Sequence, residues 1–293
     1  MHKSGFVNII GNPNVGKSTL MNALVGERLS IITSKAQTTR HRIMGIVNGS
    51  DYQIVYSDTP GILSPRYRMQ EAMMKFVGTA LVDADVIVYV TDVVEQADKH
   101  ADYIERLNSL TVPVVVVVNK IDLTTPEKLE VLVEQWHEMA PRALIIPASA
   151  IEKFNLDALF GKLLALLPEG EAYYDKDTFT DKSLRFFASE IIREKIFLSY
   201  SKEIPYCTEV AIEEFKEEEK IYRISAVIYV ARESQKGIII GHQGKMLKKV
   251  GMQARKDMED FFEKKVFLQT FVKVNPDWRD SDRKLREFGY IQE

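Results

Sequence analysis

A glycine-rich segment near the N-terminus constrains the fold of this chain more than any other feature. It comprises Gly11, Asn12, Pro13, Asn14, Val15, Gly16, Lys17 and Ser18. The apolar run at residues 6–10 predicts a buried strand before it, and the pattern from Thr19 predicts a helix after it. In such a unit the glycines let successive N–H groups point inward, where they and the helix N-terminus bind phosphate. The order predicts a phosphate-binding loop in which Lys17 reaches the outer phosphates and Ser18 ligates Mg²⁺.

Length and composition indicate a globular protein. The 293 residues suffice for one or two domains, and 45% hydrophobic with 28% charged residues is ordinary for a soluble chain. The longest apolar candidate, residues 112–118, is interrupted by Pro113 and falls short of the roughly 20 residues that span a bilayer. The first residues lead directly into a strand, so no signal peptide is expected. These features predict a cytoplasmic protein without a transmembrane segment.

Cysteine use and charge narrow the class further. Cys207 is the single cysteine, so no intrachain disulfide can form, and without a nearby His it is expected to be a buried structural thiol. The net charge of −3 argues against a protein that coats nucleic acid generally. Positive residues nevertheless outnumber negative ones between residues 236 and 273, after an acidic stretch at residues 213–219. A local basic face is therefore expected in the second half.

Apolar runs alternate with helical patterns in the first half. The runs are residues 6–10, 52–56, 86–91, 114–118 and 144–146. They are continuous rather than alternating, as expected for strands buried on both faces. The predicted fold class is α/β, with a mostly parallel sheet and helices on both faces. An additional edge strand is expected at residues 42–47, paired to residues 52–56 through a tight turn.

Polar residues follow the predicted strands at the sheet edge where ligands bind in this architecture. Residues 52–56 lead into Asp58, Thr59, Pro60 and Gly61. Asp58 is placed to hold the water shell of a metal opposite Ser18, and the N–H of Gly61 to meet a γ-phosphate. An ordinary strand-to-loop turn is the alternative, because Asp, Pro and Gly all favour turns.

The next strands lead into a predicted base-recognition site. Asn119, Lys120 and Asp122 follow residues 114–118, and Ser149 and Ala150 follow residues 144–146. The Asp122 carboxylate accepts hydrogen bonds from guanine N1–H and N2–H₂, donors that adenine lacks, which predicts selection of GTP over ATP. Lys120 is expected to cover the base, Asn119 to brace neighbouring loops, and an N–H after the last strand to meet guanine O6. A solvated turn is the alternative for each segment alone, but their order favours a nucleotide site.

These segments, in order over residues 5–166, resemble the translation-factor-type GTPases. The resemblance implies that residues 35–40 form the first switch, where a Thr ligates Mg²⁺ while the γ-phosphate is present. Thr39 is favoured, because Thr–Arg is the pairing in related GTPases, and Thr38 is the alternative. Ile62 stands where Ras-like proteins carry a water-orienting Gln, which predicts slow hydrolysis or completion of the site by another group.

Asn14 matches an Asn of the potassium-activated branch of these GTPases. The resemblance implies that Asn14 helps to bind K⁺ near the phosphates, where a cation stabilises transition-state charge as an arginine finger does. A loop-shaping role for Asn14 is the alternative. K⁺ is therefore a candidate cofactor beside GTP, GDP and Mg²⁺.

The sequence between residues 169 and 181 lacks periodicity and predicts a linker between domains at 1–168 and 182–293. In order, the second domain shows a helix, two strands, a further helix, a Gly-x-x-Gly segment, a Lys-rich helix and a last strand. This order resembles a KH domain of the second topology, whose loop clamps single-stranded nucleic acid. The implied RNA-binding residues are Ile239, Gly241, His242, Gln243, Gly244, Lys245, Lys248 and Lys249, with bases expected on the apolar strip near Ile238 and Ile239. An ordinary turn is the alternative for the loop alone; Trp278 is expected to pack on the domain, with base stacking as its alternative.

A GTPase domain followed by a KH domain resembles the Era family of bacterial ribosome-assembly GTPases, of the TrmE-Era-EngA type. The implied catalytic residues are Asn14, Lys17, Thr39 and Gly61, and the implied Mg²⁺ ligands are Ser18, Thr39 and Asp58. The resemblance implies a nucleotide-gated switch that binds the 3′ end of 16S rRNA in the 30S subunit precursor. It also implies peripheral contact with the inner membrane, and we expect a monomer. The rival interpretations are an enzyme that uses GTP incidentally and an RNA-binding adaptor with an inactive nucleotide site.

Overall fold

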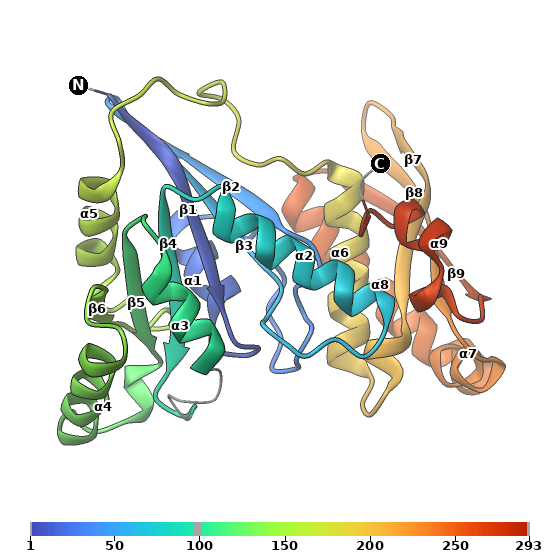
Figure 1. Cartoon of the computed structure of the whole chain (residues 1–293). Coiled ribbons are helices and arrows are strands. Elements are labelled where there is room, and N and C mark those ends of the chain that lie inside the picture. The colour runs from blue at the N-terminus through green and yellow to red at the C-terminus, as the bar shows by residue number, and fades with distance from the viewer. Residues whose placement is uncertain (1, 96–100, 292–293) are drawn as a thin grey trace. The chain divides into compact units, whose positions relative to one another are not determined.

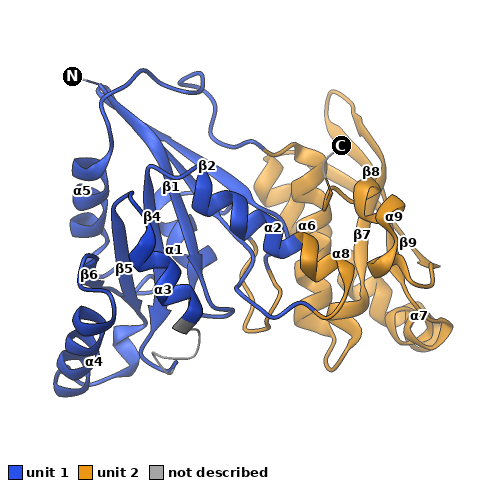
Figure 2. Ribbon diagram, in the orientation of Figure 1, with its two compact units in different colours: residues 1–30, 39–65, 73–181 blue, residues 31–38, 66–72, 182–293 orange. Residues whose placement is uncertain are grey.

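The computed structural model describes residues 2–95 and 101–291 (Figure 1). It divides into two compact units, which Figure 2 colours separately. Unit 1 comprises Met1–Ser30, Thr39–Pro65 and Met73–Asp181, and unit 2 comprises Ile31–Thr38, Arg66–Ala72 and Lys182–Glu293. Two short segments from the first half of the sequence therefore belong by their contacts to unit 2.

Unit 1 contains a six-stranded sheet. Its strands are β1 (Lys3–Gly11), β2 (Ile43–Asn48), β3 (Tyr52–Asp58), β4 (Val86–Asp92), β5 (Val114–Asn119) and β6 (Leu144–Pro147). Their order is β2-β3-β1-β4-β5-β6; only the β2–β3 pair is antiparallel. Every residue of β4 is buried, as expected where both faces of a sheet are covered. The mostly parallel sheet and its antiparallel edge strand confirm the prediction.

Helices follow the strands of unit 1. They are α1 (Lys17–Val25), α2 (Arg68–Val82), α3 (Ala101–Ser109), α4 (Pro126–Met139) and α5 (Leu156–Leu166), with a 3-10 turn at Ile121–Leu123. The first turn of α2 belongs to unit 2. One core cluster joins the sheet to α2, α3 and α4, with Trp136 against Tyr89 at a ring-centroid distance of 5.7 Å. Local signals set the ends: Pro126 opens α4, and Gly26 in the left-handed conformation ends α1.

The chain after α5 runs along unit 1. Isolated bridges join Lys3 to Glu169 and Gly45 to Thr180, and the Ile46 N–H donates to Phe179 O at 2.9 Å. Residues 169–181 are therefore tied to this unit by backbone hydrogen bonds. Their assignment as a linker, and the domain limits at 168 and 182, stay predictions.

Unit 2 is a three-stranded sheet with helices. In chain order its main elements are α6 (Leu184–Ser199), β7 (Glu209–Glu217), β8 (Ile221–Val230), α7 (Glu233–Ile240), α8 (Lys245–Phe262), β9 (Lys265–Val274) and α9 (Asp282–Glu287). Three 3-10 turns lie at Ile204–Cys207, His242–Gly244 and Trp278–Asp280. Strand β8 is central, antiparallel to β7 and parallel to β9. The parallel pair is connected through α7, the Gly-x-x-Gly loop and α8, which confirms the predicted KH order.

The core of unit 2 contains two residues whose packing was expected from the sequence. Cys207 is buried, as predicted for a structural thiol. Trp278 is fully buried, donates its indole N–H to Cys207 O at 3.2 Å and packs against Phe288. Packing rather than base stacking is therefore its role. Among the helices of the described residues, none has both the length and the hydropathy of a membrane span.

Candidate nucleotide site and RNA-binding loop

The predicted phosphate loop connects β1 to α1 and surrounds the Lys17 amine. Lys17 Nζ donates to Gly11 O at 3.0 Å and to Asn12 O at 2.7 Å. Gly16 has a φ of +96°, and a Cβ there would lie 2.2 Å from Asn119 Nδ2. Only glycine fits this position without moving its neighbour. The loop thus curls around a buried cation at the helix N-terminus, a geometry suited to phosphate.

Burial shifts the ionisation of two groups in opposite senses. It lowers the pKa of Lys17 to about 8, although the negative charges of Asp58 and Glu95 act against this. It raises the pKa of Asp58, against the positive charge of Lys17 and hydrogen bonds from hydroxyl groups. Both shifts come from the loss of solvent around a charged form. Polyanionic phosphate would favour the charged form of Lys17, and a metal cation would favour the charged form of Asp58.

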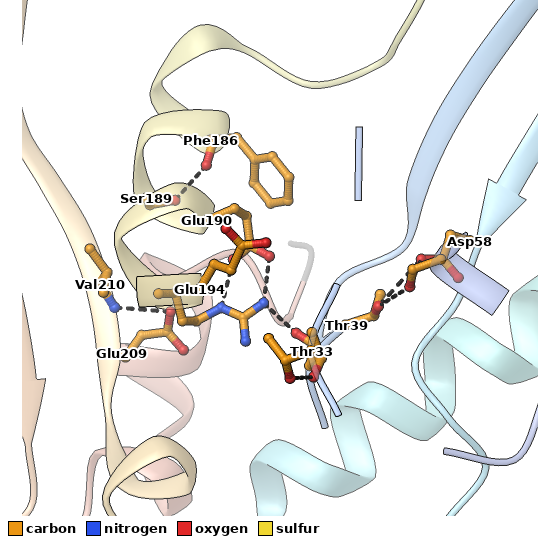
Figure 3. Close-up of polar contacts among 12 residues, drawn as sticks. Thr33, Thr39, Asp58, Phe186, Ser189, Glu190, Glu194, Glu209 and Val210 are labelled. Atoms are coloured by element: carbon orange, nitrogen blue, oxygen red, sulfur yellow. Dashed lines mark hydrogen bonds and ion pairs between the residues drawn. The ribbon is translucent and has the colours of Figure 1, made fainter. Parts of the chain in front are cut away.

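Three side-chain oxygens that could ligate a metal meet at the end of β3. Ser18 Oγ donates to Asp58 Oδ2 at 2.6 Å and lies 2.8 Å from Thr39 Oγ1, which itself lies 3.3 Å from the same carboxylate oxygen. Figure 3 shows the Thr39 hydroxyl directed at Asp58. Two hydroxyls and a carboxylate suit a hard cation such as Mg²⁺. The Thr38 hydroxyl is instead bonded to Thr33 at 2.6 Å and to Lys35 O at 2.6 Å.

The segment after Asp58 packs tightly on the phosphate loop. Thr59 Oγ1 donates to Ile9 O at 2.8 Å. A Cβ on Gly61 would lie 2.8 Å from Pro13 Cα, so a side chain there would displace backbone. Ile62 is 2% exposed and its N–H donates to Gly11 O at 3.1 Å. Its side chain thus belongs to the core and cannot orient a water molecule.

The predicted base-recognition residues lie together. Asp122 Oδ1 accepts from Ser149 Oγ at 2.5 Å, which orients the carboxylate. Asn119 donates to Val15 O at 2.8 Å and accepts from Ala150 N at 3.0 Å. The amide therefore braces the phosphate loop against the segment after β6, the bracing role expected from the sequence.

One charged residue of this site was missed by the sequence analysis. Asp92, at the end of β4, forms a 2.5 Å ion pair with Lys120, whose amine also donates to Asn14 O at 2.6 Å. Asn14 itself is exposed with a φ of 66°. A cavity of 540 Å³ beside it is lined by Pro13, Asn14, Val15, Asp92, Val94, Glu95 and Lys120. The strand-end rule that located Asp58 and Asn119 could have located Asp92 as well.

The Gly-x-x-Gly loop has the backbone geometry that its glycines permit. Gly241 and Gly244 have φ values of 69° and 74°, and Gln243 between them has 53°. A Cβ at Gly241 would lie 2.7 Å from Met246, whereas Gly244 faces open space. The exposed polar side chains of the loop and of the first five residues of the helix after it are His242, Gln243, Lys245, Lys248 and Lys249. Three lysines are therefore exposed directly after the loop, and the wider basic face stays a prediction.

Ile239 differs from its expected place beside the RNA. Its side chain is fully buried in the core of unit 2, whereas that of Ile238 is 49% exposed. Consecutive residues of a helix point about 100° apart, so only one of the two can face solvent here. The exposed apolar side chain before the loop is Ile238.

Comparison with known proteins extends the similarity over both units. Residues 6–120 match the model of a family described as 50S ribosome-binding GTPase, and residues 203–279 match that of the KH domain. GTPase Era of Clostridium acetobutylicum is 47% identical over 293 residues, which cover 99% of this chain and 98% of the relative. The chain belongs to the Era family of GTPases. GTPase Era of Syntrophus aciditrophicus is 46% identical over 99% of this chain and 96% of the relative.

Solved Era structures share the fold. Era in complex with MgGDPNP and nucleotides 1506–1542 of 16S ribosomal RNA matches with a TM-score of 0.96 and 39% identity, over 100% of both chains. A variant of Aquifex aeolicus Era bound to GDP.AlF4⁻ matches with a TM-score of 0.95 and 39% identity, over 99% of this chain and 100% of that one. The expected combination of a GTPase domain and a KH domain is confirmed. As an Era family member, the chain is a GTPase with an RNA-binding domain.

Proposed function

We propose that this GTPase acts as a nucleotide-gated switch in assembly of the 30S ribosomal subunit, binding the single-stranded 3′ end of 16S rRNA. The observation that carries the proposal is the pairing of two sites in one chain. Ser18, Thr39 and Asp58 converge beside the phosphate loop, while the helix that follows the loop at 241–244 presents exposed lysines in the other unit. The Era relative described above was solved with both a GTP analogue and 16S rRNA.

The nucleotide site divides into phosphate and base contacts. The loop and Thr19 would hold the phosphates, with Mg²⁺ on Ser18, Thr39 and Asp58. A bound Mg²⁺ supplies charge neutralisation on the outer phosphates. Asn119, Lys120 and Asp122 would hold the guanine, and a backbone N–H in the segment of Ser149 and Ala150 would meet guanine O6.

Hydrolysis would depend on fixed charges rather than on a water-orienting side chain, since Ile62 is apolar and buried. Lys17 and the N–H of Gly61 would stabilise the charge of the transferred phosphate. Asn14 would bind K⁺ near the phosphates; its exposure and positive φ suit both this role and a loop-shaping one. The expected intrinsic rate is slow.

The RNA would run over the Gly-x-x-Gly loop. Close backbone approach at Gly241 and Gly244, and the lysines at 245, 248 and 249, suit phosphates of a single strand. Ile238 rather than Ile239 would contact a base, because only Ile238 is exposed. We further propose a monomer in the cytoplasm, with peripheral contact at the inner membrane.

Fluorescence anisotropy with a labelled single-stranded RNA from the 16S 3′ end tests the switch. Tighter binding with a non-hydrolysable GTP analogue than with GDP is expected. Equal RNA affinity in the two nucleotide states would show that nucleotide binding and RNA binding are not coupled.

Single-turnover hydrolysis distinguishes the active switch from an adaptor with an inactive nucleotide site. GDP formation in the presence of Mg²⁺, K⁺ and this RNA is expected, and omission of K⁺ tests the monovalent cation. RNA binding without GDP formation would favour the adaptor.

A further inference from the structure

Helix α6 of unit 2 holds the segment that leads into Thr39. Lys35 Nζ donates to Tyr200 O at 2.8 Å, just past the C-terminal end of the helix. Glu194 accepts from the Ile32 N–H at 3.4 Å. These contacts lie within unit 2, to which Ile31–Thr38 belongs. A segment from the first half of the sequence is therefore fastened to the RNA-binding unit.

Arg193 makes the contact nearest to Thr39. Its guanidinium donates through Nε to one oxygen of Glu190 at 2.7 Å and through Nη2 to the other. The same Nη2 donates to the backbone oxygen of Thr38. The Arg193 and Glu190 side chains are only 1% and 5% exposed. Figure 3 shows Glu190 on α6, with dashed lines from its carboxylate.

A buried ion pair of this kind is poor evidence for stability, because apolar side chains of similar volume serve a core equally well. Arg193 Nη1 is buried without a hydrogen-bond partner in the described residues, which adds to the cost. What the pair supplies is geometry. The Glu190 carboxylate fixes the planar guanidinium of Arg193, which aims one donor at a single carbonyl.

The carbonyl of Thr38 and the nitrogen of Thr39 belong to the same planar peptide group. A hydrogen bond that holds this carbonyl therefore also holds the orientation of the peptide plane and the position of the Thr39 backbone nitrogen. The boundary between the two units falls at this peptide bond. On one side lies the Arg193 contact, and on the other lies the Thr39 hydroxyl with Ser18 and Asp58.

We propose that Arg193, oriented by Glu190, is a positioning residue for GTP hydrolysis: by holding the Thr38 carbonyl it places the Thr39 hydroxyl for the metal. The inference rests on the proposed role of Thr39 as a Mg²⁺ ligand. The positioning needs only one hydrogen bond, from Arg193 to the Thr38 carbonyl, and the planar peptide group that joins Thr38 to Thr39. Loss of this bond affects the state that contains a γ-phosphate, not the GDP state.

The test compares Arg193→Met and Arg193→Lys with Arg185→Met in the full chain. Arg185 is a matched control on the same helix, because it also donates to backbone carbonyls, those of Ile212 and Glu213. Single-turnover hydrolysis is measured against Mg²⁺ concentration, together with affinity for GDP and for a non-hydrolysable GTP analogue. Both Arg193 variants should hydrolyse GTP at least tenfold more slowly, need more Mg²⁺ and bind the analogue more weakly, with GDP affinity within twofold of wild type. Arg185→Met should match the wild type.

A double-mutant cycle with Thr39→Ala separates positioning from general destabilisation. Arg193→Met should add no further loss of rate or analogue affinity in a Thr39→Ala background. Additive losses, or equal losses of GDP and analogue affinity, overturn the proposal. If Arg193→Met does not fold, Glu190→Gln keeps the side-chain volume and should show the same selective loss. If Thr39→Ala slows single-turnover hydrolysis but the Arg193 substitutions do not, this inference alone is wrong. If Thr39→Ala leaves the rate unchanged, the proposed metal site is wrong.

Discussion

The Asn119 amide joins two loops that are far apart in sequence, donating to Val15 O at 2.8 Å and accepting from Ala150 N at 3.0 Å. Asn119→Ala should leave both backbone groups unpaired and loosen the phosphate loop. A loss of ~1–3 kcal/mol, or about 5–150-fold in GDP affinity, is expected for two buried hydrogen bonds. Titration calorimetry measures it. Asn108→Ala, which removes one bond to Met139 O elsewhere in unit 1, is the control and should leave GDP affinity unchanged.

Asp122→Asn should change base preference. The amide group introduced at position 122 would place its N–H₂ donor opposite the N2–H₂ donor of guanine. Xanthine carries an oxygen acceptor at the same position of the ring. Affinity for GTP should fall by about 100-fold or more, and affinity for XTP should rise, because the wrong base leaves buried groups unpaired. Competition binding with the two nucleotides checks this. Unchanged GTP affinity would remove Asp122 from the base site.

The lowered pKa of Lys17 makes nucleotide affinity depend on pH. With a pKa of about 8 in the free protein, the amine is mostly charged at pH 7 and mostly neutral at pH 8.5. Bound phosphates raise that pKa, so binding takes up a proton, and affinity present below pH 8 is lost as pH rises. The expected fall between pH 7 and 8.5 is about fourfold. Calorimetry of GTP in EDTA isolates this effect, because the raised pKa of Asp58 acts through metal binding with the opposite sign.

The adjacent threonines provide a matched pair. Thr39→Ala removes a hydroxyl next to Ser18 and Asp58, while Thr38→Ala removes one that bonds to Thr33 and Lys35. Thr39→Ala should slow single-turnover hydrolysis by about tenfold or more, a loss of ~1.4 kcal/mol or more of transition-state stabilisation. Thr38→Ala should retain most of the rate. The reverse order would assign the metal ligand to Thr38.

Replacement of both Gly241 and Gly244 by Asp should abolish RNA binding. The substitution adds negative charge, and side chains strained by φ values of 69° and 74°, where phosphate must approach the backbone. GTP affinity should stay within twofold of wild type. Gly161→Asp, at a glycine of α5 with open space around it, adds a like charge as the control. RNA affinity that survives the double substitution would place the RNA-binding surface elsewhere.

The sequence predicted the elements well because their signals are local. Continuous apolar runs marked the buried strands β1, β3, β4 and β5, and the glycines at 11, 16, 241 and 244 occupy positive-φ positions that disfavour other residues. The rule that ligands lie beyond the carboxyl ends of parallel strands then brought Asp58, Asn119 and Asp122 to one edge of the sheet. Asp92, the last residue of β4, obeys the same rule.

The sequence could not predict which of two adjacent, identical residues is buried or which one forms a given hydrogen bond. Two adjacent isoleucines at 238 and 239 are chemically identical, and only the direction of α7 against its core decides that Ile239 is buried. Thr38 and Thr39 present the same hydroxyl, and only the fold brings one of them to Asp58.

By itself, then, the sequence determined the α/β and KH elements, the two glycine-rich loops and the residue types of the nucleotide site, since each depends on short-range pattern and backbone conformation. Only the tertiary structure decided that Ile31–Thr38 lies with unit 2 and that Arg193 contacts the carbonyl before Thr39. Such a contact joins residues 155 positions apart. No local pattern encodes it, because it depends on how helix α6 is packed and on the low dielectric in which one guanidinium is held.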